Sequence, residues 1–385
     1  MNQLIINEIT KAFTNTFKVK PLLIFSPGRI NIIGEHTDYN EGFVFPGAVN
    51  KGIYAAIEKT NHSKSTIYAL DKKSSFQFNL KSITALPEGS WENYILGVVA
   101  ELLKLNKPIG NFNFVFKGDI PAGAGMSSSA ALENSVVFGL NNLFNLKLTK
   151  TEMIFISQKA EHNYVGVKCG IMDQYASMFG KKNYALLLDC RSIKAKPFKI
   201  DFENYQLVLI NTNVKHSLSD SAYNNRRSVC ESISKTLKIK ALRDATEGDL
   251  KRIENDLTPE NYQKALFIIQ ENNRVQKASA AMLNKDLIGL GNLMYKSHEG
   301  LTKQYKVSCN ELDFLVDEAK ASNYVIGARM MGGGFGGCTI NLIEKNHTTE
   351  VLTKVSQAYK SKFNLDCSIY IVELTNGTHV ISQTT

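Results

Sequence analysis

The chain has 385 residues, 43% of them hydrophobic, which is enough for two domains and the core of a soluble globular protein. Its 45 basic and 36 acidic residues give a net charge of +9, but the lysines are spread along the chain rather than gathered in a stripe. This argues against nucleic-acid binding and favours a small anionic substrate. Six widely separated cysteines without a C-x-x-C pair indicate neither a zinc site nor a disulfide framework, and they suit a reducing compartment.

The first predicted element is a helix over residues 1–13, with Leu4, Ile5, Ile9 and Phe13 on one face. This segment lacks the charged start, continuous apolar run and small-residue cleavage site of a signal peptide. No stretch of the chain is long enough to span a bilayer. We therefore expect a cytoplasmic protein.

A short strand over 22–25 leads into residues 26–40, which concentrate charged and aromatic side chains between two glycine-bounded turns. Glu35 and Asp38 are the groups that a sugar site needs, because carboxylates accept hydrogen bonds from hydroxyls. A metal role for His36 is disfavoured, since it lacks a second histidine at helical spacing. A solvated loop with local side-chain caps is the competing interpretation.

Strands are predicted next over 52–59, 65–70, 75–80 and 111–117, with a helix over 91–105. In the last strand three phenylalanines share one face. This order is mixed α+β rather than a strict alternation of strands and helices.

Residues 118–133 form a loop of small residues between that strand and a helix beginning near three successive serines. Glycines allow close approach of the backbone, and a helix start supplies free N–H groups and a positive dipole end. The loop lacks the lysine of a Walker motif, and Ser128 replaces the third glycine of a dinucleotide fingerprint. A tight turn with serine caps is the alternative, but the three hydroxyls favour a phosphate site.

A second helix begins at Thr151 and carries Glu161, and a lone aspartate, Asp173, follows among apolar residues. Such an aspartate is either a cap at a helix start or a charge held for use. Strands over 184–189 and 206–211 are interpreted as a pair that brackets a basic turn, with a domain boundary near residues 201–205.

The remainder is predicted to contain helices over 221–238, 263–282, 287–306, 311–321 and 348–360, and strands over 339–343 and 368–373. This pattern fits a helix-covered antiparallel sheet. Five glycines between positions 332 and 337 indicate close approach of the backbone to a ligand or to another segment.

Three stretches together resemble one family. Pro27-Gly28-Arg29-Ile30-Asn31 through Glu35-His36-Thr37-Asp38-Tyr39 is similar to the galactokinase signature, and residues 121–130 resemble the ATP loop of the wider GHMP small-molecule kinases. Residues 332–338 resemble the third motif of that superfamily, and shorter matches occur at 170–174, 297–298, 307–309 and 311–312. The resemblance runs nearly from end to end. It implies an α+β fold of two lobes, a ribosomal protein S5 domain 2-like lobe over 1–203 and a ferredoxin-like lobe over 204–385.

The resemblance also implies a reaction, transfer of the γ-phosphoryl group of ATP to the anomeric hydroxyl of α-D-galactose with Mg²⁺. Galactose and ATP are then the partners of a monomer that binds neither nucleic acid nor membranes. A kinase for N-acetylgalactosamine or arabinose is one alternative. A non-catalytic sensor of galactose and ATP is the other.

Residue roles follow from the same resemblance. Asp173 is the expected catalytic base, with a physical role mainly in orienting the hydroxyl, and Arg29 stabilises the transferring group. Mg²⁺ is expected at Ser129 and Glu161, with Glu133 as the alternative carboxylate. The sugar contacts implied are Glu35, His36, Thr37, Asp38 and Tyr223. The ATP contacts implied are Gly123, Ala124, Gly125, Met126, Ser127, Ser128 and Ser129.

Overall fold

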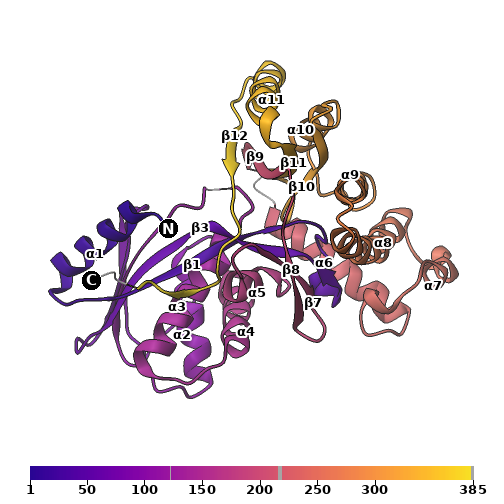
Figure 1. The fold of residues 1–385 in the computed structure, drawn as a ribbon. Coiled ribbons are helices and arrows are strands. Elements are labelled where there is room, and N and C mark those ends of the chain that lie inside the picture. The colour runs from indigo at the N-terminus through magenta and orange to yellow at the C-terminus, as the bar shows by residue number, and fades with distance from the viewer. Residues whose placement is uncertain (122, 216–218, 383–385) are drawn as a thin grey trace.

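Two lobes, each built on a sheet with helices packed against it, form the α+β fold that the sequence predicts (Figure 1). The computed structural model describes residues 1–121, 123–215 and 219–382. Ala122, part of the predicted phosphate loop, lies outside the described residues. Among the helices described, none has the length and apolar content needed to cross a bilayer.

The first lobe contains a six-stranded sheet in the order β13-β1-β3-β6-β4-β5, in which only β4 and β6 run parallel. Its strands are β1 (Leu22–Asn31), β3 (Pro46–Lys59), β4 (Ser65–Ala69), β5 (Ser74–Phe78), β6 (Phe112–Gly118) and β13 (His379–Val380). One face carries α2 (Glu92–Lys104), α3 (Ser128–Phe144), α4 (Lys150–Ala160) and α5 (Met172–Phe179), and α1 (Gln3–Phe17) covers the other (Figure 1).

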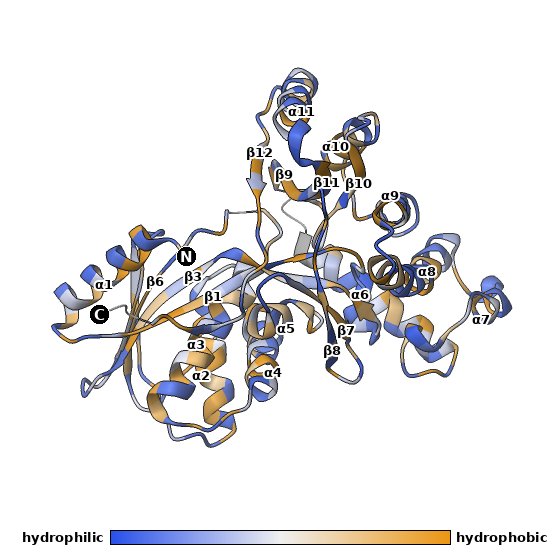
Figure 2. Cartoon of the chain, in the orientation of Figure 1, coloured by the Kyte–Doolittle hydropathy of each residue, from blue (hydrophilic) through white to orange (hydrophobic). Residues whose placement is uncertain are grey.

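Alternation along the strands explains both faces. Phe112, Phe114 and Phe116 of β6 join the core beneath α2 and α3, as their spacing predicts, while Val115 between them packs with α1. In Figure 2 the hydrophobic colouring is strong on α2, whereas α7 at the edge of the molecule is mostly hydrophilic. One detail of the predicted α1 face is wrong: Leu4 is 80% exposed, because it lies in the first turn, off the stripe that enters the core.

A small three-stranded sheet of β2 (Phe43–Val44), β7 (Tyr184–Asp189) and β8 (Lys194–Lys199) corrects another prediction. The basic stretch expected as a turn is itself strand β8, which pairs with β7. Its Phe198 is buried while the lysines are exposed, a pattern that suits an edge strand. The other member of the expected pair belongs to β9 (Tyr205–Lys215) in the second lobe.

The second lobe has an antiparallel sheet in the order β10-β11-β9-β12, formed by β10 (Val325–Met330), β11 (Gly336–Glu344), β9 and β12 (Ser368–Ile371). Strand β10 was not predicted, since its residues run directly into the glycine motif. The helices of this lobe are α6 (Ser219–Thr236), α7 (Glu247–Arg252), α8 (Pro259–Leu283), α9 (Leu287–Lys303), α10 (Asn310–Lys320) and α11 (Thr348–Phe363). The expected helix-covered antiparallel sheet is confirmed.

The two lobes share one apolar core. Leu207 and Ile340 on the inner face of the second sheet belong to the same cluster as Ile30 and Phe45 of the first lobe, together with Val275 of α8. The outer face packs against α10 and α11. The end of β1 is therefore held against β10 and β11, which brings segments far apart in sequence to one place.

The end of the chain returns to the first lobe. Strand β13 pairs with β1, an isolated bridge joins Leu374 to Val49, and the Ile381 N–H donates to the Leu23 carbonyl at 2.8 Å. The expected division between residues 203 and 204 stays a prediction, and this final segment does not remain with the second lobe.

Candidate functional site

A narrow pocket of about 110 Å³ lies where the end of β1, the start of α5, helix α6 and the β10–β11 turn meet. The residues that line it come from both lobes and are Arg29, Glu35, His36, Asp38, Glu161, Val167, Cys169, Met172, Asp173, Tyr223, Gly332 and Gly333. Both expected catalytic residues, one expected metal ligand and four of the five expected sugar contacts are thus together.

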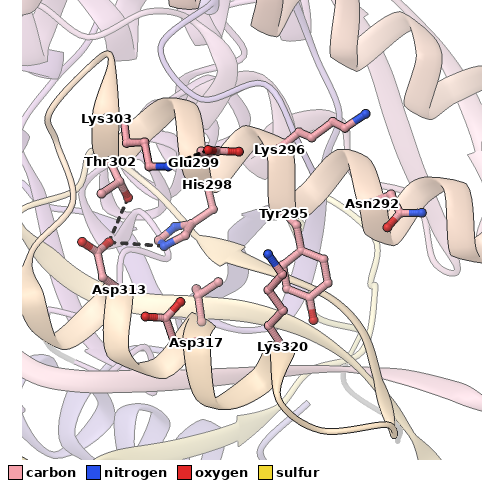
Figure 3. Close-up of a pocket in the computed structure, with 11 residues that line it drawn as sticks. Asn292, Tyr295, Lys296, His298, Glu299, Thr302, Lys303, Asp313, Asp317 and Lys320 are labelled. Atoms are coloured by element: carbon pink, nitrogen blue, oxygen red, sulfur yellow. Dashed lines mark hydrogen bonds and ion pairs between the residues drawn. The ribbon is translucent and has the colours of Figure 1, made fainter.

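A larger hollow of about 480 Å³ opens between α9 and α10, and it contains none of these residues (Figure 3). His298, part of a short family match, lines it and takes the Met330 N–H on its Nδ1 at 3.2 Å. Its Nε2 lies 3.3 Å from Asp313, which also accepts from the Thr302 hydroxyl (Figure 3). This hollow lacks converging catalytic groups, so the chemistry belongs to the smaller pocket.

Arg29 and Asp173 form a bidentate ion pair in that smaller pocket. The Nε and Nη2 of Arg29 donate to the two carboxylate oxygens at 2.8 and 2.9 Å. The Nη1 of Arg29 donates to the Gly125 carbonyl, and the Ser127 hydroxyl donates to Asp173 Oδ2. Burial acts to lower the pKa of Arg29, but Asp173 and Glu35 outweigh it, so the pKa is raised and the cation is permanent.

This arrangement also decides between the two interpretations of Asp173. It lies in the first turn of α5, but the helix has no side-chain cap, and the carboxylate points to Arg29 and Ser127 instead. Asp173 is therefore a charge held in the pocket rather than a helix cap.

The segment after β1 is not a solvated loop, which removes the competing interpretation of its charges. Glu35 and Asp38 are 2% and 8% exposed. Glu35 Oε1 accepts from Arg329 at 3.0 Å and from the Gly332 N–H at 2.9 Å. Asp38 accepts from the Tyr39 N–H at 2.9 Å and is buried close to Asp173. Buried carboxylates placed in this way are available to accept hydrogen bonds from a polar ligand.

His36 occupies an aromatic corner of the pocket. Its backbone has φ of +65°, and its Nδ1 lies 2.9 Å from the Tyr39 hydroxyl, which is 2.7 Å from that of Tyr305. The His36 ring centroid is 5.3 Å from that of Tyr223. Burial and Arg226 lower the pKa of His36 to about 3, so the ring is neutral at physiological pH. Its buried Nε2 makes no hydrogen bond of good geometry within the described part of the chain, although the Gly333 backbone interacts with the ring, so this atom is available to a ligand beside Gly333.

Thr37, the fifth expected sugar contact, is placed differently. It is fully buried, its hydroxyl lies 2.9 Å from the Gly34 carbonyl and 2.6 Å from the Phe43 carbonyl, and it does not line the pocket. Its side chain holds the loop in shape and is turned away from the position of a ligand.

The glycine loop and the glycine motif of the second lobe pack backbone against backbone. Gly123 and Gly125 have φ of +71° and +66°. A side chain at Gly125 would lie 3.2 Å from the Met331 carbonyl, and one at Gly337 would lie 3.2 Å from the Gly123 carbonyl. The close approach of the backbone expected for the glycines at 332–337 is confirmed, with another segment of the chain as the neighbour. The approach of the loop glycines to a ligand stays a prediction.

The other residues of the loop divide between core and solvent. Met126 is 1% exposed and packs into the shared core, and its carbonyl accepts from the Arg29 N–H at 3.0 Å. Ala124 is also buried, whereas Ser128 is exposed at the first turn of α3. Ser127 precedes the helix with φ of +56°, which directs its hydroxyl to Asp173 instead of capping α3. The loop thus presents a helix start and polar groups next to the Arg29–Asp173 pair.

Two buried carboxylates, Glu161 and Glu133, lie near Ser129 and close to Asp173. Glu161 begins a short π-helix (Glu161–Val165), and burial together with Asp173 raises its pKa to about 7, while hydrogen bonds from Ser129 and Gln174 act to lower it. Glu133 is fully buried, and burial with the nearby Glu161 raises its pKa well above the usual range. Gln174 Nε2 donates to Glu161 at 2.9 Å and to Glu133 at 3.3 Å.

No group of three or more His, Cys, Asp or Glu side chains that could hold a metal ion occurs among the described residues, so the fit to a hard divalent cation rests on Glu161 and Ser129. Burial and repulsion by Asp173 disfavour the ionised form of Glu161, and a bound cation would offset this cost. Ser129 supplies a neutral oxygen beside it. Glu161 lines the pocket, whereas Glu133 lies behind it with one oxygen, Oε1, unpartnered among the described residues. The geometry therefore favours Glu161 over Glu133 as the ligand.

Sequence reasoning missed several residues of the site. Val167 lines the pocket as an apolar wall, and no pattern in its neighbourhood singles it out. Met172 lines it as well and lies inside the short family match at 170–174, but it was given no role. Arg329 was overlooked as well. The available signal was an arginine inside an apolar strand directly before the glycine motif.

Comparisons with known proteins now identify the class. Residues 93–181 match the GHMP kinases N terminal domain, residues 278–361 match GHMP kinases C terminal, and residues 11–59 match the galactokinase galactose-binding signature. The crystal structure of Methanococcus jannaschii mevalonate kinase shares the fold, with a TM-score of 0.65 at 20% identity over 93% of this chain and 99% of that one. The fold and the pocket define a two-lobed kinase of the GHMP class.

More similar relatives narrow this class. The galactokinases of Clostridium beijerinckii and Clostridium acetobutylicum are 40% and 38% identical, each over 98% of this chain and 99% and 100% of their own lengths. The structure of Lactococcus lactis galactokinase in complex with galactose has a TM-score of 0.94 at 32% identity, covering 98% of this chain and 100% of that one. The chain belongs to the galactokinase family, the ATP-dependent kinases of galactose. The predicted family, fold and activity are confirmed.

Proposed function

We propose that the chain transfers the γ-phosphoryl group of ATP to the anomeric hydroxyl of galactose, with the sugar bound in the pocket of both lobes. One observation carries this proposal. The Arg29–Asp173 pair lies in the same pocket as Glu35, Asp38 and the Nε2 of His36, directly beside the glycine loop. An arrangement of this kind brings an acceptor hydroxyl and a phosphate group together.

Asp173 and Arg29 have different roles in the transfer. Asp173 accepts the hydrogen of the acceptor hydroxyl and so fixes the direction of its oxygen lone pairs. Phosphoryl transfer passes through a loose transition state in which positioning and charge neutralisation provide most of the catalysis. Arg29 is buried, permanently charged and rigidly held, so it can stabilise the charge that develops on the transferred group without reorganising.

Ser129 and Glu161 are the residues that would hold Mg²⁺. When bound, this ion neutralises phosphate charge and positions the transferred group. The support is the adjacent Ser129 hydroxyl and the penalty that burial imposes on Glu161. Glu133 would then keep Gln174, and through it Glu161, in place.

Replacement of Glu161 by Gln should raise the Mg²⁺ concentration needed for half-maximal activity by about tenfold, because a charged oxygen ligand is lost. Titrating activity against Mg²⁺ at saturating ATP and galactose measures this shift. Glu133→Gln serves as the matched control and should leave the Mg²⁺ requirement within about twofold. A larger shift for Glu133→Gln than for Glu161→Gln would assign the metal to Glu133.

The sugar contacts proposed are Glu35, His36, Asp38 and Tyr223, which all line the pocket. The carboxylates accept hydrogen bonds from sugar hydroxyls, and the neutral His36 presents Nε2. Thr37 contributes indirectly, by fixing the loop that carries these residues. A site of this kind penalises any sugar that leaves one of these buried groups unpaired.

Galactose binding should weaken as the pH falls below about 6. Burial, together with Asp173, raises the pKa of Asp38 to about 6, so the fraction of ionised carboxylate decreases from pH 7 to pH 5. Affinity should fall by about tenfold over this interval if only the ionised form accepts the hydroxyl hydrogen. His36 is not responsible, because its pKa of about 3 keeps it neutral throughout.

Calorimetric titration with galactose, without nucleotide or Mg²⁺, measures this affinity. Glu161 also titrates in this interval, with a pKa of about 7, so the Asp38→Asn variant is the control: it should bind more weakly and lose the part of the pH dependence that Asp38 causes. A wild-type affinity that is constant from pH 7 to pH 5 would exclude the proposed role of Asp38.

ADP release with a panel of sugars tests the function as a whole. Galactose should give the highest kcat/KM, ahead of N-acetylgalactosamine, arabinose and galactosamine, with mevalonate inactive. A higher kcat/KM for N-acetylgalactosamine or arabinose would assign a different substrate. Tight binding of galactose and ATP without any ADP release would instead indicate a sensor.

We also infer that the chain acts as a monomer in the cytoplasm, with a first lobe over 1–203 that the final segment rejoins and a second lobe that begins at residue 204. The support for a reducing compartment is that all six cysteines are free, and Cys190, Cys230 and Cys338 are buried without a disulfide. The spread of the excess positive charge supports a small-molecule role without nucleic-acid or membrane partners.

A further inference from the structure

Arg329 is a fully buried cation that joins the two lobes next to the sugar pocket. It lies near the end of β10 in the second lobe (Figure 1). Its guanidinium donates to the carbonyls of Asn31 and Ile32 at the end of β1, at 2.5 and 2.8 Å, and to that of Met330 at 2.6 Å. Among the described residues it forms an ion pair with Glu35, at 3.0 Å.

This contact fixes one oxygen of Glu35 and leaves the other for the pocket. Oε1 accepts from Arg329 and from the Gly332 N–H, and both donors belong to the second lobe. Because two donors hold one oxygen, the carboxylate plane is set, and Oε2 remains for a ligand in the pocket that Glu35 lines. A buried carboxylate without these donors would be both mobile and poorly solvated.

The other nearby cation does not hold Glu35 in this way. Three of the five N–H groups of Arg29 donate to the two oxygens of Asp173 and to the Gly125 carbonyl, and Arg29 acts on Glu35 through its charge. Arg329 is itself held firmly, since the Met330 N–H beside it donates to the buried His298. Orientation of Glu35 therefore depends on the position of β10.

We propose that Arg329 is a positioning residue for sugar recognition, which holds Glu35 so that its free oxygen accepts one particular hydroxyl of galactose. This inference rests on the proposed function of the pocket. It makes the second lobe part of the sugar specificity, although the recognition loop itself follows β1 in the first lobe. Arg329 does not touch the sugar and acts only through Glu35.

The test compares Arg329→Met, Arg329→Lys, Glu35→Gln and the double variant Arg329→Met/Glu35→Gln with the wild type. Galactose affinity, the KM for ATP and the affinity for each monodeoxy-galactose are measured. We expect Glu35→Gln and Arg329→Met to weaken galactose binding by about tenfold or more, while the KM for ATP changes by less than about threefold. The galactose affinity of Arg329→Lys should lie between that of these two variants and that of the wild type, because lysine keeps the charge but not the planar set of donors of the guanidinium.

The deoxy sugars distinguish a loss of Glu35 orientation from a loss of affinity caused by a disturbed fold. The wild type should lose affinity when the hydroxyl read by Glu35 is removed, and this penalty should shrink at the same ring position in Glu35→Gln and in Arg329→Lys. The double variant should bind galactose no more weakly than Glu35→Gln alone. Losses that multiply in the double variant, or an unchanged deoxy-sugar pattern in Arg329→Lys, would overturn the proposal.

Two further comparisons keep the test decisive if Arg329→Met unfolds. The double variant removes the uncompensated buried charge and should recover thermal stability relative to Arg329→Met, so binding can still be measured. Arg252→Met, at an exposed arginine of α7 paired with Asp249, is the control and should leave galactose affinity unchanged. A wild-type protein that fails to phosphorylate galactose would refute the proposed function. A wild type that succeeds beside an Arg329→Lys variant of full affinity and discrimination would refute only the role of Arg329.

Discussion

The Asp173→Asn variant should bind galactose with near wild-type affinity and turn it over about a thousandfold more slowly, or worse. An amide has nearly the shape of the carboxylate and keeps one oxygen for Arg29. It cannot take up the hydroxyl proton, and its NH₂ group must face either the Ser127 hydroxyl or Arg29, both of which are donors in the wild type. The acceptor hydroxyl then loses both its orientation and the destination of its proton.

Steady-state kinetics for kcat and calorimetry for galactose binding separate these two effects. Asp201→Asn, at an exposed aspartate on the loop before β9, is the matched control and should keep full activity. An Asp173→Asn variant that phosphorylates galactose at close to the normal rate would show that Asp173 is not the group that handles the acceptor hydroxyl.

Replacing Arg29 by Met should lower kcat by about a thousandfold, because an arginine that neutralises the transferring phosphoryl group contributes on this scale. The side chain is 5% exposed, so its charge acts in a weakly screened environment. Arg29→Lys should recover only part of the loss, since lysine cannot hold both oxygens of Asp173 and the Gly125 carbonyl at once.

The same kinetic assay measures this series, with melting temperature as the check on folding. Arg29→Met leaves Asp173 without its partner, so some loss of stability should accompany the loss of rate. An Arg29→Met variant that stayed within tenfold of the wild-type kcat would show that Arg29 does not stabilise the transferring group. Arg252→Met again provides an unaffected surface control.

Strong periodicity made much of the fold predictable from sequence. The phenylalanine strand β6 and the amphipathic helices α2 and α10 have bounds within a residue or two of those expected. The sequence pattern did not predict strands whose pairing partners lie far away in the chain or whose ends merge with a motif. Strand β8 reads as a basic turn because only one of its apolar side chains enters the core, and β10 merges with the glycine motif that follows it.

The site was predictable as a set of residue types but not as a geometry. Arg29 and Asp173 are 144 positions apart, and no spacing rule brings them together. The family resemblance supplied that link, and the structure shows the pair in contact. The orientation of Thr37 and the burial of Arg329 depend on packing between lobes, which a one-dimensional pattern does not encode.

The path of the chain has a mechanical consequence for how the lobes move. The backbone crosses between them twice, through residues 200–205 and through residues 371–375. Asn183 touches both crossings, since its N–H donates to the Leu374 carbonyl and its carbonyl accepts from Ile200. Two crossings tied at one place, together with the apolar core that the lobes share, hold the lobes in one relative position. We therefore expect the sugar loop and the turn between β10 and β11 to keep their relative position when a ligand binds.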